Sequence, residues 1–183
     1  MNNTKKIFVC ASINLSNSER INNQAIALGE ILGMRDVTYV QGGSAQGLMG
    51  LTLKEFIKYS NNVEFIVPDV YYSEDVPMLS SILGKDDLRI EKVHGEGGRL
   101  NAIKECDHII VLPGGTGTME ELLYCNETSR AKEHNSKITL VNIDGYYDAI
   151  IQQINTGINL GLIKQSAIKF DVINDVNELE LDK

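Results

Sequence analysis

The sequence predicts a Rossmann-like α/β fold, a doubly wound parallel sheet in a single domain that spans residues 1–183. Short apolar runs, which are typical of buried parallel strands, alternate along the chain with segments whose apolar residues recur at helical spacing. Two of these strands end in glycine-rich turns that lead directly into helices. Repeated strand–helix units of this kind form a parallel sheet that binds ligands at the carboxyl ends of its strands.

The first half of the chain contains three predicted strands and two predicted helices. These elements are a strand at 7–11, a helix with apolar residues from 21 to 32 that stops at Gly33, a strand at 37–40, a glycine-rich turn at 41–50 that continues as a helix through 57, and a strand at 63–67. Pro68 ends the third strand. The segment after it, with Tyr71, Tyr72, Pro77 and Met78, predicts no regular element and is interpreted as a lid or a connector.

The second half continues the alternation with weaker signals at its ends. The predicted elements are an exposed strand at 88–93, a loop at 94–99 that leads into a short helix through about 105, a strand at 109–112, a helix from about 116 to roughly 133, a strand at 138–142, a helix that opens at 144–148 and runs to about 158, and a last strand at 169–173.

The composition bounds the function classes that the chain supports. Hydrophobic residues make up 43% of the 183 residues, which is enough for one substantial core. The formal net charge of −8, without a basic run, argues against a nucleic-acid or anionic-membrane surface. No apolar run approaches the length of a membrane span, and no signal-peptide core follows the first six residues. We therefore expect a cytoplasmic protein.

Cysteine and histidine show no pattern of metal ligands. The three cysteines, Cys10, Cys106 and Cys125, are odd in number and are expected to be buried free thiols in a reducing compartment. The histidines also lack the spacing of a metal site or a catalytic triad, and His108 is interpreted as structural: they are His94, His108 and His134.

The stretch from Ile109 to Leu123 organises the predicted site. A buried strand is followed by Pro113 and three glycines, and a helix opens at about Thr116. Glycines let backbone N–H groups approach a ligand, and a helix N-terminus adds free donors and a positive dipole end. This pattern predicts a phosphate site. Glu120 and Glu121 follow within two turns; they either complement the helix dipole or act on the molecule that carries the phosphate.

Two common nucleotide-binding motifs are absent from these turns. The first strand ends in Ala11-Ser12-Ile13-Asn14, without the Gly-x-Gly-x-x-Gly turn of a dinucleotide fold. No Gly-Lys-Ser/Thr follows either glycine-rich turn, so the Walker-type loop is absent as well. A nucleoside monophosphate fits two glycine turns and a carboxylate better than a dinucleotide does.

Three stretches together resemble the LOG ("lonely guy") family, whose members were long described as lysine decarboxylases. They are Gly42–Gly50, the signature Pro113–Glu121 (Pro-Gly-Gly-x-Gly-Thr-x-x-Glu), and Leu140–Asp148. The resemblance runs in order from about Ile7 to Ile163. It implies a homodimer with active sites near the interface, and hydrolysis of the N-glycosidic bond of adenosine-type 5′-monophosphates. It implies no redox cofactor and no metal.

The resemblance also assigns roles to individual residues. It implies that Glu121 is catalytic and that the phosphate binds along Gly114, Gly115, Thr116, Gly117 and Thr118. Ser12, Gly43 and Met49 are further candidates for nucleotide contact. Family members carry Glu-Arg-Lys before the signature strand. That triplet falls on Gly97-Gly98-Arg99, so the arginine's own position is Gly98, and Arg99 serves only if the local structure is shifted by one residue.

The predicted chemistry follows from a carboxylate beside a ribose. Cleavage of the glycosidic bond builds positive charge on the sugar, which Glu121 would stabilise while it orients or deprotonates water. Arg99 would fix the ribose or the base. The alternative function is a non-catalytic nucleotide or cofactor binder of the same fold, as in related carriers of molybdenum cofactor. Decarboxylation is rejected, because it needs a Schiff-base lysine and the turn contains none.

Overall fold

A computed structural model describes residues 4–84 and 88–181 and shows a single α/β domain of Rossmann-like architecture. Seven parallel strands form one sheet in the order β4-β3-β2-β1-β5-β6-β7. The strands are β1 (Lys5–Cys10), β2 (Val37–Gln41), β3 (Val63–Pro68), β4 (Ile90–Val93), β5 (His108–Val111), β6 (Lys137–Val141) and β7 (Asp171–Ile173). The α-helices are α1 (Glu19–Gly33), α2 (Gly47–Phe56), α3 (Tyr72–Leu83), α4 (Gly95–Ile103), α5 (Thr116–Arg130) and α6 (Asp148–Asn159).

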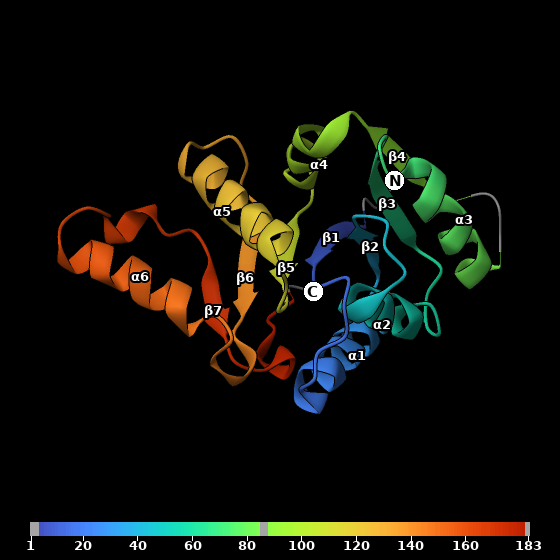
Figure 1. The fold of residues 1–183 in the computed structure, drawn as a ribbon, viewed down its shortest axis with the longest axis horizontal. Coiled ribbons are helices and arrows are strands. Elements are labelled where there is room, and N and C mark those ends of the chain that lie inside the picture. The colour runs from blue at the N-terminus through green and yellow to red at the C-terminus, as the bar shows by residue number, and fades with distance from the viewer. Residues whose placement is uncertain (1–3, 85–87, 182–183) are drawn as a thin grey trace.

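The helices cover the two faces of the sheet in separate groups, as Figure 1 shows. One core cluster combines residues of α1, α2 and α3 with one face, and the other combines α4, α5 and α6 with the opposite face. Strand β1 serves both cores, because successive side chains of a strand point to opposite faces. Ile7 and Val9 belong to the first cluster, and Phe8 and Cys10 belong to the second.

The strand order places the switch point of the fold beside β1. After β1 the chain adds β2, β3 and β4 on one side, and it then returns to place β5, β6 and β7 on the other side. In open parallel sheets the crevice for ligands lies at the carboxyl ends of the strands where the order reverses. Here those ends belong to β1 and β5, and β5 leads into the glycine turn before α5.

The predicted fold class is confirmed, and the predicted strands are all present with small changes of boundary. The largest difference is α3, because the sequence predicts a lid or connector without a regular element after Pro68. It is helical in spite of Pro77, and Leu79 is fully buried in the core between α3 and the sheet. Burial of this apolar side chain stabilises a helix that a proline in its interior disfavours. The predicted strand at 88–93 begins before β4, and residues 85–87 lie outside the described part of the chain.

Helix α4 begins earlier than the sequence predicted. The loop expected at 94–99 is already helical from Gly95 onwards, so three glycines lie within the first turns. The Asp69 carboxylate accepts a hydrogen bond from the Gly95 backbone N–H (3.0 Å) and pairs with His94 Nδ1 (2.9 Å). A carboxylate at a helix N-terminus stabilises its free donors and its dipole. This cap comes from 26 residues upstream, where local pattern cannot reveal it.

Other expectations concern membrane spans, metals and thiols. Within residues 4–84 and 88–181, no helix is both long enough and apolar enough to cross a bilayer. The same residues contain no group of three or more potential metal ligands. The three thiols are free and buried, as predicted for Cys10, Cys106 and Cys125.

Candidate active site

The turn between β5 and α5 presents the free end of a helix. Gly115 is the N-cap, and within the described chain no side chain caps it. The backbone donors of the first turn are therefore free for an anion. Two tyrosines brace the turn from the β6–α6 connection. Tyr146 donates its hydroxyl to the Gly114 carbonyl (2.5 Å), and Tyr147 donates to the Leu112 carbonyl (2.7 Å).

A cavity of about 580 Å³ lies at the carboxyl ends of the central strands, next to this turn. It is lined from the ends of β1 and β2, from α3 and α4, and from the start of α5. Eight of the ten predicted site residues line it: Ser12, Met49, Arg99, Gly115, Thr116, Gly117, Thr118 and Glu121. The fold thus brings together residues that are separated by more than a hundred positions in the sequence.

Gly43 and Gly114 are not among the lining residues, and both have a steric role in the backbone. Gly43 has a φ of +102°, and a Cβ on it would lie 2.8 Å from Val67. A Cβ on Gly114 would lie 2.2 Å from the Thr118 hydroxyl oxygen. Both glycines allow close packing behind the cavity, and Gly114 lets Thr118 fold back against the turn.

Glu121 is an almost fully buried carboxylate that lines this cavity. It lies in the second turn of α5, and only 6% of its surface is exposed. Burial raises its pKa above the ordinary glutamate value, while the nearby Arg99 charge and a hydrogen bond with Cys10 act in the opposite direction. Burial likewise raises the pKa of the Cys10 thiol, which Glu121 reinforces. A carboxyl group with a raised pKa in a cleft is suited to acid–base chemistry.

Arg99 reaches this carboxylate from the opposite wall. Its Nε lies 3.5 Å from Glu121 Oε1, and its Nη2 lies 2.8 Å from Glu96 Oε2, three residues earlier on α4. The side chain of Arg99 is largely buried. Positive charge is therefore placed between two carboxylates.

The structure also shows where a side chain at position 98 would point. A Cβ on Gly98 would lie 3.0 Å from the Val93 Cβ in β4. Arg99 instead lies beside the β2 turn, where its Nη1 is 3.5 Å from a Cβ placed on Gly42. With α4 starting at Gly95, position 99 faces the cavity and position 98 faces the sheet. The one-residue shift between this chain and the family motif is consistent with that geometry.

Sequence reasoning missed the part of the cavity wall that α3 and Glu96 provide. The residues of α3 and its approach that line the cavity are Tyr71, Glu74, Asp75 and Met78. They were unassigned because α3 itself was not predicted. Glu96 was placed in a loop, and its spacing from Arg99 acquires meaning only when both lie on one helix.

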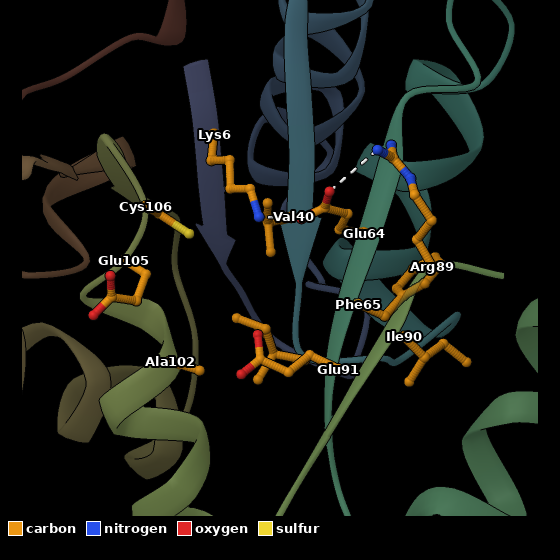
Figure 2. A pocket seen from close by; sticks show the side chains of 11 residues that line it. Lys6, Val40, Glu64, Phe65, Arg89, Ile90, Glu91, Ala102, Glu105 and Cys106 are labelled. Carbon is orange, nitrogen blue, oxygen red and sulfur yellow. Dashed lines mark hydrogen bonds and ion pairs between the residues drawn. The ribbon is translucent and has the colours of Figure 1, made fainter. Parts of the chain in front are cut away.

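A second cavity, of about 420 Å³, lies on the sheet face that α4 covers, and Figure 2 shows its lining. Its central charges are already paired with each other. Glu64 accepts from Lys6 Nζ (2.6 Å) and from Arg89 Nη1 (3.1 Å). None of the predicted site residues lines this cavity. Paired charges of this kind need no ligand, so the cavity at the strand ends is the candidate active site.

Comparison with known proteins places the chain in a family. A family model described as "Possible lysine decarboxylase" matches residues 49–182. A protein of Arabidopsis thaliana named "Probable cytokinin riboside 5′-monophosphate phosphoribohydrolase LOG6" is 32% identical over 162 residues, which cover 87% of this chain and 78% of that protein. The chain belongs to the LOG family. The LOG resemblance seen in the three sequence stretches is thereby confirmed.

A second LOG-family relative comes from rice, Oryza sativa subsp. japonica. The protein named "Probable cytokinin riboside 5′-monophosphate phosphoribohydrolase LOG4" is 32% identical over 82% of this chain. This chain spans 64% of the length of that protein. The cavity does not support the activity that the family description names, decarboxylation of lysine. No lysine is among the described residues that line it, so a Schiff base has no partner there.

Solved structures of similar fold include a protein that binds a cofactor. The molybdenum cofactor binding protein from Rippkaea orientalis superimposes with a TM-score of 0.65, over 97% of this chain and 93% of that chain. The two sequences are only 15% identical. This similarity shows that the LOG-family chain shares the fold.

Proposed function

We propose that this LOG-family protein hydrolyses the N-glycosidic bond of an adenosine-type nucleoside 5′-monophosphate, AMP or an N6-substituted AMP. The products are the free base and ribose 5-phosphate. One observation carries the proposal: a buried carboxylate, Glu121, lies in a cavity next to an uncapped helix N-terminus. The relatives named above are described as probable phosphoribohydrolases of cytokinin riboside 5′-monophosphates, which supports the same reaction class and a role in cytokinin formation.

The phosphate anchors the substrate at the β5–α5 turn. The backbone donors at Gly115, Gly117 and Thr118 bind the phosphate, and the helix dipole favours its negative charge. This remote binding energy holds the ribose beside Glu121, in the way that positioning lowers a reaction barrier. Ser12 and Met49 then line the path along which the rest of the nucleotide extends.

Glu121 acts on the anomeric carbon of the ribose. As the bond to the base breaks, positive charge develops on the ring carbon and oxygen, and the carboxylate stabilises it. The same group orients a water molecule and accepts its proton as the water attacks, and the departing base takes up one proton so that it leaves as the neutral free base. Arg99 lies within 3.5 Å of this carboxylate, so it helps to fix the sugar and keeps Glu121 oriented.

Two further properties belong to the proposal. We propose a homodimer in the cytoplasm, with each active site near the interface, as LOG resemblance implies. An exposed apolar residue supports an interface on α5: Leu123 is 47% exposed, two positions after Glu121. Neither a metal nor a redox cofactor is needed for the proposed reaction.

Hydrolysis of AMP tests the proposal directly. The purified protein should release adenine and ribose 5-phosphate from AMP, measured by chromatography of the base. Adenosine, which lacks the phosphate, should react at least 100-fold more slowly, because remote binding energy then no longer positions the ribose. Equal rates on AMP and adenosine would show that the glycine turn does not anchor the substrate.

A pair of variants tests the assignment of Glu121 in the same assay. Glu121→Gln should lower kcat by about 100-fold or more, since it removes the charge while it keeps the shape. AMP affinity measured by calorimetry should change little. Glu120→Gln is the matched control, because Glu120 is exposed on the adjacent position and does not line the cavity. If the two variants turn over AMP equally, Glu121 is a structural residue.

A second candidate function is binding without catalysis. The observation that favours it is the shorter contact of Arg99, which is to Glu96 at 2.8 Å and leaves Glu121 at 3.5 Å. An arginine held by a neighbour on its own helix is less available for a reacting sugar. In this case AMP or another phosphorylated ligand would bind at the turn without release of base, and calorimetry together with the hydrolysis assay separates the two functions.

A further inference from the structure

Two buried polar atoms of α4 keep unused hydrogen-bonding capacity at the cavity. In the described part of the chain, Glu96 Oε2 and Arg99 Nε are the buried side-chain atoms that have no hydrogen-bond partner. Glu96 Oε2 does lie 2.8 Å from Arg99 Nη2, and Arg99 Nε lies 3.5 Å from Glu121, but these are ion-pair contacts without hydrogen-bond geometry. A buried donor or acceptor without a partner carries a penalty that a ligand can remove.

The helix holds the two side chains that carry these atoms in contact, through Glu96 Oε2 and Arg99 Nη2. Glu96 and Arg99 are three residues apart on α4, a spacing that places both side chains on one helical face. Both residues line the cavity of the candidate active site. The ion pair between them fixes the carboxylate acceptor next to the guanidinium donor, so the ligand group that fits must satisfy both.

A hydroxyl group satisfies this pair of atoms. It donates its hydrogen to the Glu96 carboxylate and accepts a hydrogen bond from Arg99 Nε. A phosphate oxygen cannot do this, because a dianion has no hydrogen to donate and is repelled by the carboxylate. A carbonyl oxygen or a ring nitrogen of a base accepts only. A hydroxyl oxygen is therefore the single ligand atom that satisfies both partners at once.

We propose that Glu96 and Arg99 bind the 2′-hydroxyl of the substrate ribose and thereby select ribonucleotides over 2′-deoxyribonucleotides. This inference rests on the proposed function for its choice of sugar. The 2′-carbon is bonded to the anomeric carbon on which Glu121 acts, and Arg99 Nε faces Glu121 Oε1. A hydroxyl on Arg99 Nε is therefore next to the reacting carbon, as the 2′-hydroxyl is and the 3′-hydroxyl is not.

The expected selectivity is moderate. A buried site that is built to hydrogen-bond a hydroxyl rejects the analogue without it, because its polar groups are then left unpaired. The side chain of Glu96 is 41% exposed, so water can replace part of the lost contact. We expect AMP to be preferred over 2′-deoxy-AMP by about 10- to 100-fold in kcat/KM, and 3′-deoxy-AMP to lose less than 2′-deoxy-AMP.

A binding experiment tests the inference separately from catalysis. Calorimetry with the wild-type protein should show that ribose 5-phosphate binds at least about tenfold more tightly than 2-deoxyribose 5-phosphate. In Glu96→Ala the two sugar phosphates should bind with affinities within about threefold of each other. Glu105→Ala, which removes an exposed carboxylate just beyond α4 that does not line this cavity, should keep the wild-type preference.

Several results would overturn the inference. These are equal binding of the two sugar phosphates by the wild type, binding of neither, a preference that survives in Glu96→Ala, or a larger loss with 3′-deoxy-AMP than with 2′-deoxy-AMP. If Glu96→Ala does not fold, the comparison of the two sugars on the wild type still decides. A wild type that prefers ribose 5-phosphate yet releases no base from AMP would support the inference and refute the proposed hydrolysis.

Discussion

The two glycine-rich turns of this chain look alike in sequence and differ in what surrounds their glycines. Each follows a buried strand and opens a helix, β2 into α2 and β5 into α5. In the first turn, a Cβ on Gly47 would lie 2.2 Å from the backbone carbon of Ile13, and a Cβ on Gly50 would lie 2.2 Å from the Ala45 carbonyl oxygen. In the second turn, a Cβ on Gly115 or Gly117 would meet no described atom within 4 Å.

The difference separates glycines that the fold requires from glycines that leave room for a ligand. Gly47 has a φ of +57°, and the backbone after β1 packs directly on it, so no side chain fits. Gly115 and Gly117 are exposed and line the cavity. Packing within the protein does not require glycine at either position. We therefore interpret these two glycines as positions that let an anion approach the backbone closely. Similar glycine-rich sequences thus serve different purposes: close backbone packing in the β2–α2 turn and room for a ligand in the β5–α5 turn.

The largest effect that this comparison predicts is the loss of stability in Gly47→Ala. The new Cβ meets backbone rather than a flexible side chain, and the left-handed φ adds strain of its own. We expect the free energy of unfolding to fall by about 3 kcal/mol or more, measured by urea denaturation. Gly117→Ala is the matched control and should change stability by no more than about 1 kcal/mol, in the stabilising direction for a helical position. Equal losses in both variants would break the comparison.

An intermediate effect is predicted for Gly115→Ala, and it should appear in activity rather than stability. The free energy of unfolding should fall by no more than about 1 kcal/mol, because the methyl group has room and only the N-cap preference for glycine over alanine is lost. The kcat/KM for AMP should fall by about 10- to 100-fold, since the methyl group displaces the phosphate from the backbone donors. The rate on adenosine should not change. A normal kcat/KM for AMP would show that the phosphate binds elsewhere.

The sequence was informative where structure depends on local pattern. Buried parallel strands are continuous apolar runs, and this is why the five inner strands were predicted near their observed positions. The edge strands β4 and β7 are more exposed and gave weaker sequence signals. Helix α3 was missed because Pro77 signals a break, and the burial of Leu79 that stabilises it depends on the distant sheet. The start of α4 was misplaced for the same reason, since its cap, Asp69, lies 26 residues away from Gly95.

The candidate site was predicted in part, for a related reason. The motif in the β5–α5 turn indicated a phosphate site and a nearby carboxylate from contiguous residues alone. The direction of Arg99 could not be derived, because two adjacent positions on a helix differ by about 100° and the helix start was uncertain by several residues. Glu96 was missed entirely, since only the folded α4 places it beside Arg99 and over the cavity.

Equivalent positions on the two helices show how the second turn differs in its buried polar group. Thr52 is the sixth residue of α2, and Glu121 is the sixth residue of α5. Both are buried. Thr52 donates its hydroxyl to the Leu48 carbonyl (3.0 Å), which satisfies it within its own helix. Glu121 carries a carboxyl group whose charged form is disfavoured by burial. The positive charge of Arg99 offsets this effect only in part, so the pKa of Glu121 remains raised.

The smallest predicted effect follows from this contrast, and it concerns stability as a function of pH. The pKa of Glu121 is raised in the folded protein by burial, so between the ordinary glutamate value and the raised value the folded state binds more protons than the unfolded state. Stability from this group is therefore fully present at low pH and is lost as the pH rises through that window.

Glu121→Gln cannot lose a proton. At pH 7 its Tm should exceed that of the wild type by about 2–4 °C, which corresponds to about 1 kcal/mol for a chain of this size. The difference should vanish towards pH 4, and exposed Glu120→Gln should show none of it. A wild type that is at least as stable as Glu121→Gln at pH 7 would mean that Arg99 fully compensates the buried charge, and the two helices would then be equally satisfied at their sixth residues.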